Sequence, residues 1–338
     1  MFSPVLLVGC ERPAPPATAG RSEVSAADRD TSLEAIDRWL TAGQPESGEA
    51  IARVLLRRLP RDPHVRLALA RTLVARAGRV QAAEGPGAAA PLAREAGEIL
   101  APEVRPDTLG QADLVVWNRT RGLALENAGL DAEAIGTYRE TAGVDRVTAL
   151  YLALALLRVD ETAEATRILE ELSNSSEPEP FILAALAEAR FDPNAPEEAR
   201  TLVARAVRLD PDAWAIRLRQ AAIERRAGRP DVAIEMLSAL TEEIRTERAV
   251  CEELARAWQA YGDPARAGDI WANRARTYPN DLGAALEAAT YFGVAGRIDD
   301  AEAWIRVVEN VNPDDARIRD ARAQLDRAVS NRAVDTAP

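Results

Sequence analysis

The sequence contains no lysine, so all 42 of its basic residues are arginine. A phosphate-binding loop ending in Gly-Lys-Ser/Thr is therefore impossible, as is a Schiff-base lysine. The single histidine, His64, excludes a zinc site with two histidines on one helix. The two cysteines, Cys10 and Cys251, are too few for a four-cysteine zinc site or a disulfide framework. Aromatic residues make up only 4% of the chain, which disfavours a β-sandwich.

Alanine and other apolar residues dominate the composition. Hydrophobic residues fill 47% of the 338 positions, enough for a sizeable core, and about a fifth of all residues are alanine. This composition suits helices that pack closely through small side chains. Acidic residues outnumber basic ones by 54 to 42, which gives a net charge of −12. Because a protein that binds the nucleic-acid backbone usually carries the opposite sign, nucleic acid is disfavoured as a partner.

The first thirty residues differ from the rest of the chain. A short apolar run ends in Leu7-Val8-Gly9-Cys10, and a stretch rich in proline and alanine follows over residues 11–30. The four-residue motif resembles the lipobox of bacterial lipoproteins, although no arginine precedes the run. The resemblance implies that residues 1–10 are a signal remnant, that Cys10 is lipidated, and that residues 11–30 are a flexible tether. The alternative is a frayed apolar terminus with a chance match.

An internal repeat of 34 residues organises the remainder. Two series of alanines, one of glycines and one of prolines keep this step. The alanines are Ala165, Ala199, Ala233, Ala267 and Ala301, and Ala187, Ala221, Ala255 and Ala289; the glycines are Gly228, Gly262 and Gly296; the prolines are Pro211, Pro279 and Pro313, with Arg245 filling the gap. Three residue types locked to one period predict a repeat protein.

Each unit has the pattern of two helices joined by a turn. In one unit an apolar-periodic helix runs to Gly262, which supplies a turn conformation that other residues resist. A second helix follows and Pro279 ends it, because proline cannot continue a helix. Ala255 and Ala267 are predicted to lie where the two helices cross, since a larger side chain there would hold the axes apart.

These features resemble the tetratricopeptide repeat. The segment Ala206-Val207-Arg208-Leu209-Asp210-Pro211-Asp212 matches the end of that repeat, and Gly122-Leu123-Ala124-Leu125 with Gly129, Ala134, Ile135 and Tyr138 matches its middle. The resemblance implies an all-α superhelix (an α-solenoid) of about seven to eight helix-turn-helix repeats. It also implies that the first helix of each pair faces a concave groove. The best units lie at 113–146, 147–178, 180–212, 213–246, 247–280 and 281–314.

Outside the array at 113–314 the pattern loosens. Residues 31–112 are predicted to form degenerate repeats whose first helix begins at Ser32, with a loop or extended turn at Gly85–Pro91. Residues 315–330 are predicted to form a capping helix, and residues 331–338 a disordered tail. His64 is expected at an exposed helix start, after Asp62 and Pro63, and Cys251 on an apolar helix face.

The predicted register places a set of polar residues on the concave face. They are Arg119, Glu126, Asn127, Arg158, Arg219, Arg225, Arg226, Glu252, Arg256 and Gln259. Arg219, Arg226 and Arg256 form a basic strip that could hold a carboxylate or a peptide terminus. The alternative is that all ten are ordinary solvated positions. Some tetratricopeptide proteins bind chaperone tails through lysine and asparagine residues in this groove; this sequence has no lysine and lacks the matching asparagine pair, so that activity is not implied.

The repeats occupy about 280 residues and leave no room for a separate catalytic domain. The sequence therefore predicts a non-enzymatic scaffold that binds a protein or peptide and needs no metal or cofactor. Membrane contact is expected only through Cys10, which would anchor the protein in the bacterial envelope, facing the periplasm, as an assembly or secretion factor. Two alternatives stay open: an enzyme that cleaves carbohydrate or peptidoglycan on a helical solenoid, and an unlipidated cytoplasmic adaptor.

Overall fold

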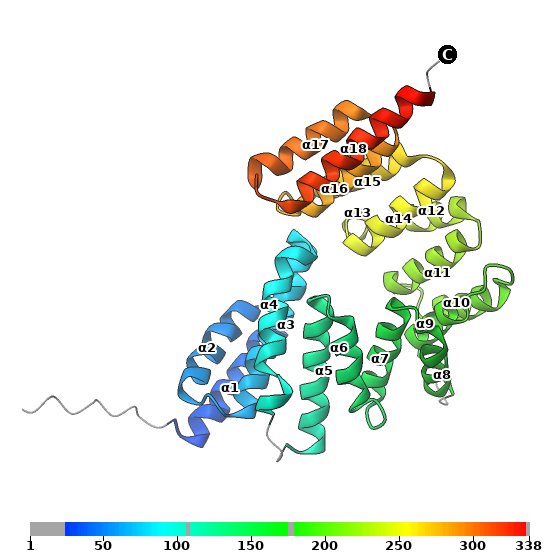
Figure 1. The fold of residues 1–338 in the computed structure, drawn as a ribbon. Coiled ribbons are helices and arrows are strands. Elements are labelled where there is room, and N and C mark those ends of the chain that lie inside the picture. The colour runs from blue at the N-terminus through cyan, green and yellow to red at the C-terminus, as the bar shows by residue number, and fades with distance from the viewer. Residues whose placement is uncertain (1–23, 106–108, 175–178, 336–338) are drawn as a thin grey trace, which may run out of the picture.

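The computed structural model describes residues 24–105, 109–174 and 179–335. Within these ranges all regular secondary structure is helical, and consecutive helices pack as hairpins that stack side by side (Figure 1). The first helices of the hairpins are α1 (Ala26–Thr41), α3 (Pro63–Glu84), α5 (Gln111–Asn127), α7 (Arg146–Arg158), α9 (Pro180–Ala189), α11 (Trp214–Arg226), α14 (Arg248–Tyr261) and α16 (Leu282–Val294). The second helices are α2 (Pro45–Arg58), α4 (Pro86–Ile99), α6 (Asp131–Arg139), α8 (Thr162–Ser173), α10 (Glu197–Leu209), α12 (Pro230–Ser238), α15 (Pro264–Thr277) and α17 (Ile298–Val311).

Three helices lie outside the eight hairpins. They are the 3₁₀ turn η1 (Pro102–Val104), the short α13 (Glu242–Arg245) and α18 (Ala316–Asp335), which packs on α16 and α17. Each first helix from α1 to α11 contacts the next first helix in the series, ending at α14, so these helices form one face of the stack. The predicted all-α superhelix of helix-turn-helix units is confirmed.

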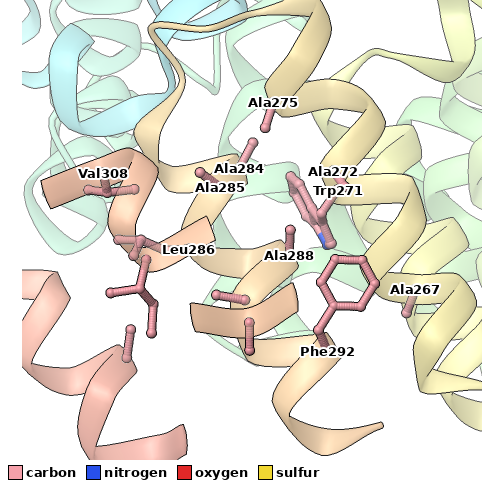
Figure 2. Packing of buried hydrophobic residues seen from close by; sticks show 14 of the residues in the cluster. Ala267, Trp271, Ala272, Ala275, Ala284, Ala285, Leu286, Ala288, Phe292 and Val308 are labelled. Atoms are coloured by element: carbon pink, nitrogen blue, oxygen red, sulfur yellow. The ribbon is translucent and has the colours of Figure 1, made fainter. Parts of the chain in front are cut away.

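Small residues at the helix crossings allow large ones to fill the space beside them. Ala255 and Ala267 are fully buried where α14 and α15 meet, as the 34-residue step predicts. Trp271 and Phe292 belong to the same core cluster as both alanines, and Figure 2 shows Phe292 between Trp271 and Ala267. A Cβ added at Gly268 would lie 2.6 Å from the ring of Phe292, so this position also requires the smallest residue. Burial of large apolar side chains, at about 1.5–3 kcal/mol each, therefore depends on alanine and glycine opposite them.

The repeat glycines end the first helices as predicted. Gly228, Gly262 and Gly296 have φ of +77°, +96° and +75°, the left-handed region that glycine enters without strain. The Gly262 N–H donates to the carbonyl of Gln259 at 3.0 Å, and α15 begins two residues later. At the gap in the proline series, Arg245 ends the one-turn helix α13, which stands where the other repeats have Pro211, Pro279 or Pro313.

The prediction of a flexible tether over residues 11–30 is wrong at its carboxyl end. Helix α1 begins at Ala26, because the Ser25 hydroxyl accepts a hydrogen bond from the Asp28 N–H at 3.1 Å and caps the helix. Ser32, predicted as the helix start, lies inside α1 and donates its hydroxyl to the carbonyl of Asp28. Serine serves both roles, and the sequence alone does not separate them. Cys10 and the rest of residues 1–23 lie outside the described residues.

The predicted loop over Gly85–Pro91 is also wrong. Only Gly85, with φ +88°, forms the turn, and α4 begins at Pro86 and contains Pro91. Proline at the first helical position is favourable, and Pro91 removes only one backbone hydrogen bond in the second turn. Full burial of Ala89 and Ala93 against Ala77 offsets that loss.

The predicted capping helix exists but is longer than predicted. Helix α18 covers part of α16 and α17 with Ile318, Ala321 and Leu325, and its backbone stays helical to Asp335. Residues 331–335 were predicted to belong to a disordered tail. The sequence offers no glycine or proline to end the helix before Pro338. Among the described residues, no helix combines the length and the apolar character needed to span a bilayer.

Candidate functional site

A pocket of about 550 Å³ opens on the face formed by the first helices. Its lining comes from four successive first helices and from no second helix. The lining residues are Arg158 of α7, Phe181 and Glu188 of α9, Trp214, Ala215, Leu218, Arg219, Ala222, Ile223 and Arg226 of α11, and Ala249, Glu252, Glu253 and Arg256 of α14. The face predicted to form the groove therefore carries a concave site.

Half of the ten predicted groove residues line this pocket: Arg158, Arg219, Arg226, Glu252 and Arg256. The structure places the other five around it or further along the stack. Glu126 contacts Arg158 from α5, Arg225 lies beside the pocket in an ion pair with Glu253, and Arg119 pairs with Asp145 at 3.5 Å. Asn127 at the end of α5 is partly buried and Gln259 on α14 is exposed, and neither lines the pocket.

The basic strip has one arginine without an ion pair. Arg219 is neutralised by Glu188, and its guanidinium also lies 5.0 Å from the centre of the Phe181 ring. Arg226 stacks 4.1 Å above the Phe191 ring and has no carboxylate partner among the described residues. An aromatic face holds an arginine in place without neutralising its charge. Arg226 is therefore positioned to receive an anionic group.

Arg256 is the second arginine of the strip with spare capacity. Its side chain is 55% exposed and its contacts to Glu252 and Glu253 are long, at 3.7 and 3.8 Å. Glu253 is buried and already accepts two hydrogen bonds from Arg225, at 2.5 and 3.3 Å. The loose contacts of an exposed guanidinium contribute little, so a ligand carboxylate competes readily for it.

Glu126 and Arg158 form a partly buried pair at one end of the pocket. The Arg158 guanidinium lies 2.9 Å from Glu126 and 2.9 Å from Asp131. Burial raises the pKa of Glu126 above its ordinary value, and the adjacent Arg158 opposes that rise only in part. The burial of the charged Glu126 carboxylate therefore costs free energy that the ion pair with Arg158 does not fully offset.

Sequence reasoning missed the apolar part of the lining and two of its acids. The missed residues are Phe181, Glu188, Trp214, Leu218 and Glu253, with the small residues between them. The 34-residue step contains the signal for most of them, because it connects Arg256 to Ala222 and Glu188, and Arg219 to Glu253. Phe181, Ala215 and Ala249 follow the same step. A solenoid presents equivalent positions in a row, so one correct groove residue predicts the others.

The isolated residues that could have carried chemistry behave as predicted. His64 is exposed after the cap at Asp62, which accepts from the His64 and Val65 N–H groups at 2.9 and 3.1 Å. Cys251 is 1% exposed, and burial raises the pKa of its thiol to about 12. At that pKa the thiolate, which is the nucleophile, is scarce at neutral pH. The part of the chain that the structure describes holds no cluster of three or more metal-binding side chains.

Comparison with known proteins finds likeness in structure but not in sequence. No family model matches the chain, and no curated protein matches it. Yeast Tom70 is similar with a TM-score of 0.52 at 14% identity, over 95% of this chain and 68% of that one. A tetratricopeptide repeat protein from Parabacteroides merdae gives 0.46 at 14% identity, over 76% of this chain and 98% of that one. A thermophilic protein with the same repeat from Thermus thermophilus gives 0.45 at 18%, over 54% and 99%.

Three features recur at the predicted 34-residue step: the paired helices, the glycine turns and the small residues at the helix crossings. The structural likeness to Tom70 spans nearly the whole chain. Identities this low establish the fold and nothing finer. The chain is an α-solenoid of tetratricopeptide-type repeats.

Proposed function

We propose that the protein is a non-enzymatic scaffold that binds a protein partner through the groove of its first helices. The observation that carries the proposal is the pocket lined by α7, α9, α11 and α14 alone. Its walls combine aromatic and apolar groups, Phe181, Trp214 and Leu218, with charged groups at fixed positions. Such a mixture is typical of surfaces that bind peptides, where apolar anchors supply affinity and charges supply orientation.

The chemistry of the pocket favours an extended peptide segment that carries a carboxylate. Four arginines against three glutamates give the lining a local positive excess, in a chain whose net charge is −12. Arg226 of α11 and Arg256 of α14 lie on neighbouring first helices and provide guanidinium groups for an acidic side chain or a chain terminus. Hydrogen bonds between charged groups contribute about 1.5–3 kcal/mol each.

Selection from a displayed library of unstructured peptides tests this function with the purified chain. Reversal of charge in Arg226→Glu/Arg256→Glu is expected to weaken binding of the selected peptides at least tenfold, because two anion contacts become repulsive. The matched control is Arg205→Glu/Arg208→Glu, which makes the same charge change on exposed positions of the second helix α10. Equal binding by both double variants would contradict the proposal.

We further propose that Cys10 anchors this scaffold by a lipid in the bacterial envelope, facing the periplasm. The support is the lipobox-like sequence Leu7-Val8-Gly9-Cys10 ahead of residues rich in proline. An assembly or secretion accessory role fits a tethered binding surface of this kind. Metabolic labelling with an alkyne analogue of palmitate is expected to mark the wild-type protein and not Cys10→Ser. An unlabelled wild type recovered from the cytoplasm would favour the adaptor alternative instead.

A further inference from the structure

The second hairpin of the solenoid touches the seventh and eighth. The turn between α3 and α4, residues Glu84–Ala88, faces the junction of α15 and α16, residues Asn280–Gly283, across a small pocket of about 230 Å³. The guanidinium of Arg274 donates to the carbonyl of Ala82 at 2.6 Å, although 192 residues separate the two. We call residues 82–88, from the end of α3 to the start of α4, the latch turn. Neighbouring hairpins already link α3 continuously to α16, so this contact closes the stack into a ring.

The sequence builds the latch turn by lengthening one hairpin. Helix α3 has 22 residues, against 16 in α1 and 17 in α5. At 1.5 Å per residue the excess carries the end of α3 about 8–9 Å further than the ends of its neighbours. Figure 1 shows the α3–α4 hairpin reaching toward the carboxyl-terminal hairpins. The latch turn lies within residues 31–112, where the 34-residue pattern loosens, so its length is not set by the repeat.

The receiving side is a buried ionic cluster around Asp281. The Asp281 carboxylate, with 0% of its side chain exposed, accepts from Arg248 at 2.6 Å and from Arg274 at 2.7 Å, and it caps α16 through the Ala284 N–H. The side chain of Arg274 is equally buried and also donates to the carbonyl of Thr246. Only the contact to Ala82 comes from the latch turn. Arg274 therefore has a partner for each nitrogen only in the closed ring, and buried donors without partners are costly.

Gly85 allows the close approach. It has φ +88°, and a Cβ added there would lie 2.8 Å from the Asp281 carboxylate oxygen and 3.1 Å from the Arg248 guanidinium. Gly228 has a similar φ of +77°, but an added Cβ there meets nothing within 4 Å. Gly85 is thus restricted by the contact across the ring as well as by its turn.

We propose that the latch turn holds the superhelix closed as a ring and thereby restricts the groove to extended segments, with entry of a folded partner requiring the latch turn to release. The restriction on partners rests on the proposed function, whereas the closure itself does not. A plain solenoid extends and shortens like a spring, since each repeat contacts only its neighbours. The contact between distant hairpins removes that freedom.

A cross-link exploits the absence of lysine from the sequence. In Ala88→Lys/Asn280→Lys, two residues that line the small pocket from opposite sides become the only side-chain amines. A short amine-reactive reagent is expected to join the two peptides in the purified full chain. Adding Gly85→Ala should reduce this product at least fivefold, and the control Gly228→Ala should leave it unchanged. Arg274→Gln, which cannot reach the Ala82 carbonyl, serves as a second opening variant if Gly85→Ala does not fold by circular dichroism.

Small-angle X-ray scattering supplies a readout without cross-linker. The radius of gyration is expected to increase in Gly85→Ala or Arg274→Gln and to stay at the wild-type value in Gly228→Ala. An unchanged radius together with an unchanged cross-link would overturn the latch. If the latch opens as expected but the library yields no peptides whose binding depends on Arg226 and Arg256, the proposed function fails while the closure stands. If such peptides are selected and neither variant opens the ring, only the latch fails.

Discussion

Replacement of Gly122 by alanine tests the helix crossing on which every repeat depends. Gly122 lies in α5 against α6, and an added Cβ would lie 2.2, 2.5 and 2.7 Å from three atoms of the Tyr138 ring. Tyr138 is fully buried and cannot swing away, so the two helices must separate by about 1 Å to restore ordinary contact. Overpacking of this kind costs about 1–3 kcal/mol.

Gly136→Ala is the matched control. Gly136 lies in the middle of the partner helix α6, is exposed, and an added Cβ meets nothing within 4 Å. Alanine there should stabilise the protein by about 0.5–1 kcal/mol, because glycine loses more conformational freedom in a helix. Both variants share that propensity gain, so the difference between them isolates the cost of overpacking. In urea unfolding followed by circular dichroism, Gly122→Ala is expected to unfold at a lower concentration than Gly136→Ala. Equal midpoints would refute the crossing argument.

Three further predictions concern buried groups and the cap. In a Cys10→Ser background, Cys251 should react with iodoacetamide at least a hundredfold more slowly in the native state than in urea, because burial raises its pKa to about 12; rapid native labelling would contradict the burial. Since the folded state raises the pKa of Glu126, its stabilising contribution is complete below about 4.5 and is lost as pH rises. The stability of Glu126→Gln relative to wild type should therefore increase from pH 4.5 to 7, and a constant difference would refute this. Leu325→Asp should detach α18 from α16, measured as faster amide exchange in α16, whereas the exposed position Arg319→Asp should not.

The repeat architecture could be predicted from the sequence because it depends on local requirements for particular residue types. Gly262 marks a turn with positive φ, Pro279 marks a helix end, and Ala255 and Ala267 mark a close approach. Each of these needs one residue type at one position, so a period of 34 exposes them together.

The helix boundaries were harder to predict where one residue type serves two purposes. Ser25 and Ser32 both precede helix-forming residues, but only Ser25 caps α1. Pro86 starts α4 and Pro91 lies within it, although a sequence containing both reads as a loop. In α4 tertiary packing decides, because Ala89 and Ala93 are buried against Ala77, and packing partners are not visible in a local window.

The sequence predicted which face of the stack carries the candidate site, but not the contacts among its side chains. Arg219, Arg226 and Arg256 were placed on the groove from the register alone, and all three line the pocket. Arg219 is neutralised by Glu188, whereas Arg226 stacks on Phe191 without an ion pair. This difference depends on side-chain geometry between hairpins, which the sequence does not give. The contact of the latch turn could not be predicted from the sequence. Whether Ala82 meets Arg274 depends on the rotation between each hairpin and the next, added over the five steps from the second hairpin to the seventh.

The central claim is that the groove of the first helices is the surface that holds a partner. Hydrogen–deuterium exchange of the full chain, with and without a selected acidic peptide, tests it directly. The account predicts slower exchange in α9, α11 and α14, which line the pocket, with α8, α10 and α12 unchanged. Slower exchange confined to the second helices would contradict it.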